Sequence, residues 1–282
     1  MARRPICQLK GKQRDWTRCV QVERKKQLLE TAPRRQIIAM HSGSHPDAGL
    51  FLSLPGADGH RMGDEQLVIA VKRRLGMQCV PHPGAACANR KATGCTCGQP
   101  LGVEGHHAAV CESGGALDRR HNSIRDMLKR RLAEDLGAAT HDEQRVEAMA
   151  GGCRTEARLD VAVTLVGKPT VYLDVAVVDA YSTNAAMELA RCQRAGVAAR
   201  TMENKKRSKY QHDKALVPFV VETHGRLGEA ATKWLMQAYH GHHEQRRCML
   251  AELSALVQSH TAGMVVAAAT SRHVLAGIMG LI

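Results

Sequence analysis

Aromatic residues are scarce in this sequence. Its 282 residues include two tryptophans, four tyrosines and two phenylalanines, so that aromatics make up 3% of the chain. Proteins that bind single-stranded nucleic acid by stacking its bases depend on aromatic platforms, and this chain has few to offer. Any binding of nucleic acid would therefore rest on contacts with phosphates.

Long apolar runs are missing as well. The two longest, AGMVVAAATS and HVLAGIMGLI, are interrupted by Arg272 and His273, and each falls short of the ~20 residues that a membrane-spanning helix needs. No apolar signal segment follows Met1, because the opening MARRPICQLKGKQRDW is basic. We therefore expect no membrane association and an intracellular, reducing compartment in which the ten cysteines need not form disulfides.

Positive charge, in contrast, is abundant. Lysine and arginine total 40 against 27 acidic residues, which gives a net charge of +13 and a pI near 9.5. A charge of this size favours an anionic partner, and nucleic acid is the obvious class. Charge alone does not separate such a protein from one that is merely basic and soluble.

The first part of the chain, residues 1–78, is basic and offers no catalytic pattern. A helix-like run covers 18–30, and HSGSHPDAG at 41–49 has the composition of a loop. In MGDEQLVIAVKRRLGM, at 62–77, four apolar residues recur at helical spacing and Gly76 is placed to end the helix; they are Leu67, Val68, Val71 and Leu75.

Residues 79–117 are rich in cysteine, glycine and proline and show neither helical nor strand periodicity. Three thiolates and one imidazole can complete a tetrahedral Zn²⁺ shell and so order a segment that is too poor in apolar residues to fold alone. In CTCGQPLGVEGHHAAVC we predict the ligands Cys95, Cys97, His106 and Cys111. His107 could replace His106, Cys87 and Cys79 could substitute among the thiols, and free cysteines in a loop are the alternative.

A basic amphipathic helix is predicted next, at 118–137. Its apolar face consists of Ile124, Met127, Leu128, Leu132 and Leu136, and Gly137 is placed to end it. The opposite face is basic and could either follow a phosphate backbone or simply be solvated; it carries Arg125, Lys129, Arg130 and Arg131.

The stretch ARLDVAVTLVGKPTVYLDVAVVDAY, at 157–181, predicts two apolar strands joined by a turn, and each strand carries one aspartate. If the hairpin is centred on Gly167, then Asp160 and Asp174 are cross-strand neighbours with Cβ atoms roughly 5 Å apart. Like charges this close need a shared proton or a hard divalent cation, for which Mg²⁺ is the natural candidate. Alternatively the carboxylates point to solvent, and Asp179 is read as a strand end outside the site.

A phosphodiester-cleaving site also needs a cation that stabilises the developing negative charge. The common arrangement places a lysine two residues after the second acid, where this chain has Ala176. The next helix, from about Ala185, ends in ENKKRSKYQ and could supply that lysine, although lysine-rich helix ends are commonly just solvated or act as localisation signals.

These motifs occur in an order that resembles a known family. A Cys/His knuckle, RHN at a helix start, LDV, LDVAVVD and KKRSKY are similar to the C-terminal region of site-specific non-LTR retrotransposon proteins that carry a restriction-like endonuclease of the PD-(D/E)XK superfamily. The resemblance covers about residues 87–240. It implies that Asp160 and Asp174 are the catalytic acids, that Lys206 is a lysine displaced onto the helix, and that Lys209 and Tyr210 complete the same run.

The resemblance has further implications and some gaps. A third carboxylate is common in the superfamily, and Glu143, Glu147 or Glu156 could supply it. Leu159 stands where the family usually has proline, and no Y/F-A-D-D motif of a reverse transcriptase is present, so residues 1–75 would correspond to the end of a polymerase region or to a linker.

The expected fold is α/β: a restriction-endonuclease-like core with a small mixed sheet flanked by helices, preceded by a zinc knuckle. The expected parts are a basic N-terminal region (1–78), the knuckle (79–117), the endonuclease domain (118–240) with ALVPFVVETHG, at 215–225, as a central strand, and a helical tail (241–282). The expected function is Mg²⁺- or Mn²⁺-dependent cleavage of DNA, in the nucleus if the source is eukaryotic, with element RNA as a second partner. The alternatives are a zinc-containing nucleic-acid-binding module with a dead nuclease site and a branched-DNA resolvase.

Overall fold

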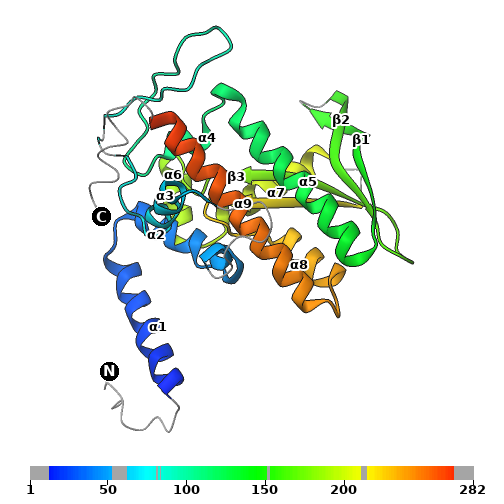
Figure 1. The fold of residues 1–282 in the computed structure, drawn as a ribbon, viewed down its shortest axis with the longest axis horizontal. Coiled ribbons are helices and arrows are strands. Elements are labelled where there is room, and N and C mark those ends of the chain that lie inside the picture. Colours follow the sequence, from blue (N-terminus) through cyan, green and yellow to red (C-terminus); the bar gives the residue numbers. More distant parts are fainter. Residues whose placement is uncertain are drawn as a thin grey trace.

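The computed structural model describes residues 13–52, 62–80, 82, 84–150, 153–210 and 215–269, with side chains described except at 13–16 and 143–157. Helices flank a small sheet on both sides (Figure 1). The elements, in chain order, are α1 (Gln13–Thr31), α2 (Arg34–Gly43), η2 (Pro46–Leu52), α3 (Asp64–Arg74), α4 (His106–Val110), η3 (Ser113–Gly115), α5 (Ala116–Leu136), β1 (Ala139–Ala150), β2 (Cys153–Thr164), β3 (Val171–Val178), α6 (Ala185–Gln193), α7 (Val197–Lys209), β4 (Leu216–Glu222), α8 (Glu229–Ala238) and α9 (His243–Ala269).

The four strands form one mixed sheet in the order β1-β2-β3-β4. β1, β2 and β3 are antiparallel neighbours, whereas β4 runs parallel to β3 after the crossover through α6 and α7. The α/β class and the small mixed sheet flanked by helices are thus confirmed. The segment ALVPFVVETHG was expected to be a central strand, but β4 covers only Leu216–Glu222 and lies at the edge of the sheet. It is apolar because it is buried from Pro218 to Glu222 beneath α7 and α8, and Pro218, which lacks an N–H, suits an edge position.

β2 and β3 pair over only a short distance and then separate. Their paired residues are Val161 with Leu173, Ala162 with Tyr172 and Val163 with Val171, so the hairpin is centred on residue 167 as predicted. Beyond Val161 the hairpin of β1 and β2 leaves the sheet and projects from the molecule, which Figure 1 shows at its upper right. We call the place where β2 parts from β3, at Asp160 and Asp174, the fork.

One long helix was predicted from Ala185 to the KKRSKY run, but the chain forms two, α6 and α7. The break falls at Arg194–Gly196, and Gly196 has φ of 76°, a left-handed conformation that glycine adopts without the steric cost other residues meet. The break frees α7 to lie against β3 and β4 independently of α6.

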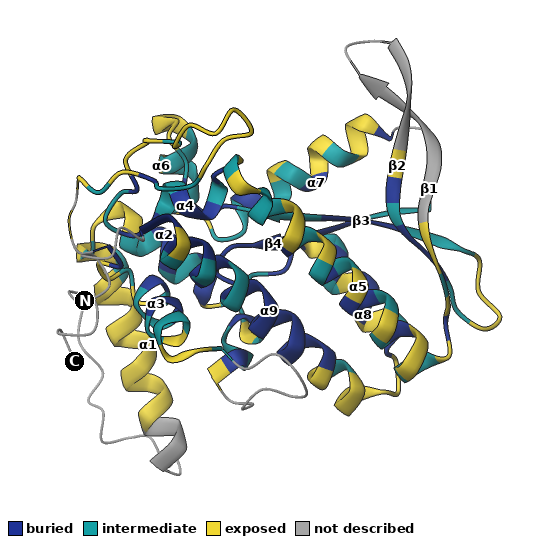
Figure 2. Ribbon diagram, turned by 45° about the horizontal axis from the view of Figure 1, so that its top comes forward, coloured by how far each residue is buried: buried dark blue, intermediate teal, exposed yellow. Residues whose placement is uncertain are grey.

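The helix α9 forms much of the core. The predicted helical segment 241–282 is a helix over His243–Ala269, and residues 270–282 lie outside the described part. Residues of its first half, among them Met249, Leu253 and Val257, pack with the sheet and α5. Residues of its second half, among them Ala262 and Val265, pack with the cysteine-rich segment. Figure 2 shows α9 as largely buried along its length.

The basic face of α5 is engaged within the protein. Arg131 Nε donates to Glu252 of α9 at 2.6 Å, and Arg130 pairs with the same carboxylate, whose side chain is 3% exposed. The remaining pairs are Arg125 with Asp126, Lys129 with Asp142, Arg130 with Glu134 and Arg131 with Asp135. The pairs with Glu252 and Asp142 join α5 to α9 and β1, and the other three pairs lie within α5 itself.

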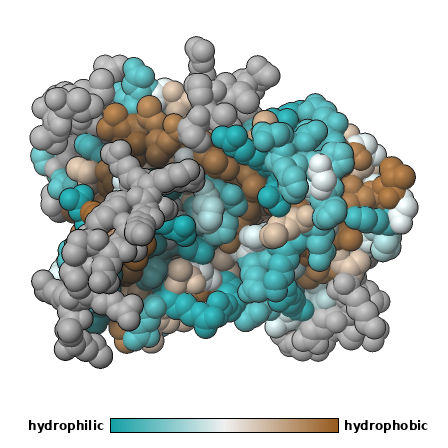
Figure 3. All heavy atoms as spheres, turned by 90° about the horizontal axis from the view of Figure 1, so that it is seen from below, coloured by the Kyte–Doolittle hydropathy of each residue, from teal (hydrophilic) through white to brown (hydrophobic). Residues whose placement is uncertain are grey.

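The described surface on the face seen in Figure 3 is mostly polar. On the face in Figure 3, hydrophilic residues cover most of the described surface and apolar residues gather in separate patches. The helix α1 stands away from the body, and its described side chains are almost all exposed (Figure 2). No helix in the described part of the chain combines the length and apolar character needed to cross a bilayer.

Candidate functional site

The fork is built by side chains that take over the hydrogen bonds of the missing β2–β3 ladder. The N–H and C=O of one strand residue point to the same side, so those of Val175 face the gap that β2 leaves. Val175 N–H donates to Asp160 Oδ2 at 2.6 Å, and Val175 C=O accepts from Lys206 Nζ at 3.3 Å. Both polar groups of β3 at the fork are thus satisfied by the residues that the sequence singled out.

The structure brings the two aspartates and the lysine together. Asp160 and Asp174 lie directly beyond the last pair of β2 and β3, Val161 with Leu173, and the negative charge of Asp160 acts on Asp174. Lys206 Nζ lies 2.7 Å from Asp174 Oδ2, and both side chains are largely buried. The lysine on α7 therefore reaches the acids that a lysine at the position of Ala176 would reach in the common arrangement.

The pKa values of the two carboxyl groups are shifted in opposite directions. Burial raises the pKa of Asp174, Lys206 opposes that rise, and the neighbouring charge of Asp160 adds to it. Burial would also raise the pKa of Asp160, but the hydrogen bond and charge of His121, together with the Val175 N–H, bring it below its ordinary value. Asp160 is therefore the carboxylate that stays ionised more readily.

His121 is a residue that the sequence reasoning missed. It lies in the second turn of α5, and its Nε2 is 3.0 Å from Asp160 Oδ1. The signal was present, because His121 falls on the same helical stripe as the buried residues Ile124 and Leu128, which face the sheet. From the sequence alone, RHN indicates only the start of a helix.

The resemblance also assigned Lys209 and Tyr210 to the site, and both lie beside the fork. Tyr210 is buried, its hydroxyl donates to the Arg158 carbonyl at 3.3 Å, and burial raises its pKa, with the charges of Asp174 and Asp160 acting in the same direction. Lys209 is exposed, with Nζ 4.9 Å from the centroid of the Tyr210 ring. The suggested third carboxylates Glu143, Glu147 and Glu156 lie outside the described side chains.

The donor set at the fork fits a hard divalent cation. Two neighbouring carboxylates supply oxygen ligands of the kind that Mg²⁺ and Mn²⁺ take. Burial raises the pKa of Asp174 and the charge of Asp160 adds to that rise, so a cation between the two acids would offset their repulsion. The residues that would hold it are Asp160 and Asp174.

A second group of ligand atoms lies in the cysteine-rich segment. The thiols of Cys87, Cys97 and Cys111 and the imidazole of His107 lie within 4.8 Å of one another, and within the described part of the chain no other set of three or more Cys, His, Asp or Glu ligand atoms does so. Backbone pairing brings Cys87 beside Cys97, since Cys97 N–H donates to the Asn89 carbonyl and Gly98 N–H to the Cys87 carbonyl. The helix α4 and the residue after it supply His107 and Cys111.

The predicted zinc ligands are half right. Cys97 and Cys111 belong to the cluster, but Cys87 and His107 take the places assigned to Cys95 and His106. Cys95 precedes Cys97 by two residues, which separates the two Cα atoms by about 6.6 Å in an extended chain. The Cys95 side chain is exposed and lies outside the cluster. Neighbouring residues of a helix point about 100° apart, so when His107 faces the thiols His106 cannot. Cys79 is buried elsewhere, near Met77 and Ile69.

The cluster fits zinc. The Cys87 and Cys111 sulfurs are 3.7 Å apart, close to the roughly 3.8 Å edge of a tetrahedron with Zn–S bonds of about 2.3 Å, and far longer than a disulfide bond. His107 Nε2 lies 3.2 Å from Cys97 Sγ, and burial lowers its pKa, which favours the neutral imidazole that a metal binds. The residues that would hold zinc are thus Cys87, Cys97, His107 and Cys111.

Zinc content distinguishes this ligand set from the predicted one. Purified protein is expected to carry about one Zn²⁺ per chain, and Cys87→Ser is expected to lose it, because a structural site does not hold with three ligands. The matched control Cys95→Ser, at an exposed thiol outside the cluster, should keep its zinc. Elemental analysis measures both, and zinc retained by Cys87→Ser but lost by Cys95→Ser would contradict the assignment.

His106 instead joins the knuckle to the sheet. Its Nδ1 pairs with the buried Asp179, which follows β3, and Thr223 Oγ1 donates to the same carboxylate at 2.7 Å. Burial would raise the pKa of Asp179, but His106, Arg73 and Thr223 lower it to about 2. Asp179 is therefore a structural anchor, consistent with its exclusion from the catalytic residues.

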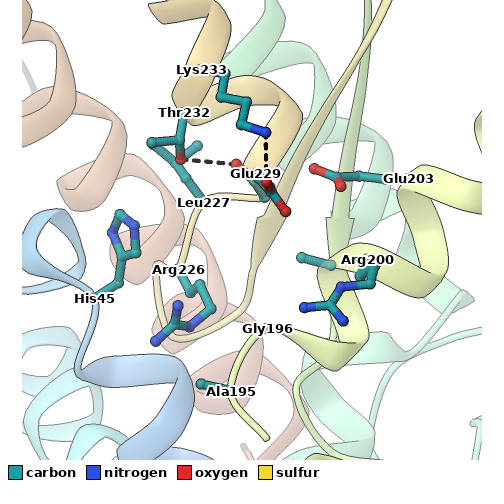
Figure 4. Close-up of a pocket in the computed structure, with 12 residues that line it drawn as sticks. His45, Ala195, Gly196, Arg200, Glu203, Arg226, Leu227, Glu229, Thr232 and Lys233 are labelled. Atoms are coloured by element: carbon teal, nitrogen blue, oxygen red, sulfur yellow. Dashed lines mark hydrogen bonds and ion pairs between the residues drawn. The ribbon is translucent and has the colours of Figure 1, made fainter. Parts of the chain in front are cut away.

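A cavity of about 340 Å³ lies away from the fork, beside the first turns of α7 and α8 (Figure 4). Several of its charged side chains have partners within the protein: Glu229 pairs with Lys233 at 2.6 Å, Glu203 accepts from Ala230 N–H at 2.9 Å, and Arg226 donates to the His41 carbonyl. Neither Asp160, Asp174 nor Lys206 lines it. The convergence of acids and a lysine makes the fork, and not this cavity, the candidate active site.

No model of a known protein family matches the chain, and no characterised protein matches it in a sequence comparison.

Proposed function

We propose that this chain is a divalent-metal-dependent DNA endonuclease related to the restriction-like enzymes of non-LTR retrotransposons. The observation that carries the proposal is the position of Lys206, which reaches from α7 to within 2.7 Å of Asp174 at the fork. Two acids and a lysine are the catalytic groups that the resemblance implies. Their convergence from two strands and a separate helix supports the proposal more strongly than any one motif in the sequence.

Each residue at the fork has a definite task in this proposal. Asp160 and Asp174 hold the metal, and Lys206 stabilises negative charge on the phosphate oxygens in the transition state. A bound divalent cation would supply Lewis acidity toward the scissile phosphate and lower the pKa of the attacking water. Lys206 also neutralises part of the charge of the two acids before DNA is bound.

The partner that we propose is DNA, with element RNA as a second ligand and, in a eukaryote, the nucleus as the location. The last turns of α7 carry exposed cations beside the fork, Lys205, Arg207 and Lys209. Such residues would contact phosphates, so the affinity for DNA should fall steeply with salt. We assign the phosphate contacts first to α7, because several cations of α5 already have acidic partners within the protein.

The decisive experiment is a plasmid-nicking assay on the full chain, with Mg²⁺, with Mn²⁺ and with EDTA. Conversion of supercoiled to relaxed or linear DNA only when a divalent cation is present supports the proposal. Tight DNA binding with no cleavage in either metal would contradict it and would favour a binding module with a dead site. Four-way junctions tested beside linear duplex separate a resolvase from a nicking enzyme.

The lysine provides a sharper prediction. Lys206→Met is expected to reduce the nicking rate by roughly 10²-fold or more, the scale on which a single transition-state stabiliser acts, with little change in DNA affinity. Lys205→Met is the matched control, because Lys205 is exposed on the same helix and should act only as a phosphate contact. It should weaken DNA binding modestly and reduce the salt dependence by about one charge. Equal nicking rates for Lys206→Met and the wild type would remove Lys206 from the mechanism.

A further inference from the structure

His121 reaches the fork from a third direction. It belongs to α5, whereas the acids belong to β2 and β3 and the lysine to α7. Its Nε2 contacts Asp160 Oδ1 at 3.0 Å, and its side chain remains 32% exposed. The backbone N–H of Val175 holds the other oxygen, Asp160 Oδ2, at 2.6 Å. The carboxylate of Asp160 is thus held at both oxygens, by β3 on one side and by α5 on the other.

His121 acts on Asp160 and does not join the two acids as a third ligand of equal standing. Within the described residues, the imidazole, Asp160 and Asp174 do not form a set of ligand atoms that all lie within 4.8 Å of one another. The contact is therefore with one carboxylate only. An oxygen that accepts one hydrogen bond keeps a second lone pair, so Asp160 Oδ1 can accept from His121 and still bind a cation.

The contact is not needed to hold α5 in place. The helix is fixed by Ile124, Leu128 and Leu132, each with 0% exposure, packed against the strands. A single hydrogen bond from a side chain that is 32% exposed adds little to such an anchor. What His121 does control is the orientation of the Asp160 carboxylate, which lies where β2 parts from β3 and which is otherwise held by the Val175 N–H.

We propose that His121 is a positioning residue for the metal site, which fixes the carboxylate of Asp160 for coordination by donating a hydrogen bond from Nε2. This inference rests on the proposed function, because it assumes that Asp160 and Asp174 share a divalent cation. Outer hydrogen-bond partners of metal ligands commonly change metal affinity by 10- to 100-fold when they are removed. A donor at this position, and not the imidazole as such, is what the site requires.

The test is Mn²⁺ binding by the zinc-loaded full chain, measured by electron paramagnetic resonance in the absence of DNA. His121→Ala is expected to weaken Mn²⁺ binding by roughly 10- to 100-fold. His121→Gln should restore most of the affinity, because the glutamine amide can donate from near the position of Nε2. His141→Ala, at an exposed histidine of β1, is the control and should bind as the wild type does.

The outcomes separate this inference from the proposed function. If the wild type binds Mn²⁺, Asp174→Asn loses this binding and His121→Ala keeps it unchanged, then only the positioning role of His121 is overturned. If His121→Gln is as weak as His121→Ala, the hydrogen-bond donor is not what matters, and the inference is equally overturned. If Mn²⁺ binding follows the expected pattern but the chain does not nick DNA, the proposed nuclease activity is contradicted. The positioning role of His121 is then still supported. A wild type that binds no Mn²⁺ overturns both.

Discussion

Asp160→Asn and Asp174→Asn are each expected to reduce metal-dependent nicking by roughly 10³-fold or more, because the site loses a charged ligand and the remaining catalytic groups act as a unit. The affinity for DNA should stay the same or rise slightly, since each substitution removes a negative charge next to the phosphates. Gel-based nicking rates and DNA titrations on the same preparations measure the two effects separately.

The control for these variants is Asp118→Asn, at an exposed carboxylate on α5 outside the fork. It should nick at the wild-type rate. Circular dichroism should find all three variants folded, since asparagine has nearly the shape of aspartate. An aspartate variant that nicks as fast as the wild type would refute the two-acid site even if the wild type proves to be a nuclease.

Glu252→Ala is expected to lower the free energy of unfolding by about 2 kcal/mol or more. The carboxylate is buried between α5 and α9 and accepts charge-assisted hydrogen bonds from Arg130 and Arg131, each of a kind worth about 1.5–3 kcal/mol. Partial exposure of the two arginines limits the loss, because water can solvate them once the carboxylate is gone. Urea unfolding followed by circular dichroism measures it.

The same helix offers a matched control in Glu244. Its side chain is 81% exposed and its nearest cation, Arg247, is 3.9 Å away, so Glu244→Ala should cost less than about 0.5 kcal/mol. If Glu252→Ala and Glu244→Ala lower the free energy of unfolding equally, the contact of Glu252 with α5 does not contribute to stability beyond that of an exposed carboxylate.

The contribution of Glu252 should also depend on pH. Burial would raise its pKa, but Arg131 and Arg130 lower it below the ordinary value. A carboxylate with a lowered folded-state pKa stabilises the protein above its unfolded pKa of about 4.3, and this stability disappears as the pH falls through the folded value. Between pH 5 and pH 3 the wild type should therefore lose more stability than Glu252→Gln, and parallel curves would argue against the pairing.

The sequence predicted the register of the β2–β3 hairpin because that register is set locally. A turn centred on residue 167 sets which residues of β2 and β3 lie opposite one another, and seven residues on either side of that centre are Asp160 and Asp174. The same logic does not reveal where the strands part. That depends on the side chains of Asp160 and Lys206, which replace the backbone partners of Val175 from elements distant in sequence.

The knuckle ligands could not be chosen from spacing because their positions depend on distant contacts. A Cβ on Gly105, at the start of α4, would lie 2.8 Å from the Val265 side chain of α9, and Ala88 N–H donates to the Ala268 carbonyl. These contacts set the direction of α4 and hence which histidine faces the thiols. Similarly, the segment after residue 240 carries no motif. Its contribution to the apolar core depends on which elements pack against it, and the sequence does not show these.

The course of α9 has a consequence for how the protein would respond to loss of its metal. Zinc finger-like segments are often treated as modules that can be removed or exchanged, but here one helix contributes to both apolar clusters. Free energy from zinc binding at the knuckle would then be shared with the sheet, since the two parts cannot melt without breaking the same helix. A chelator acting on the knuckle would lower the melting temperature of the whole body, and the fork would lose its shape at a distance from the site where zinc was removed.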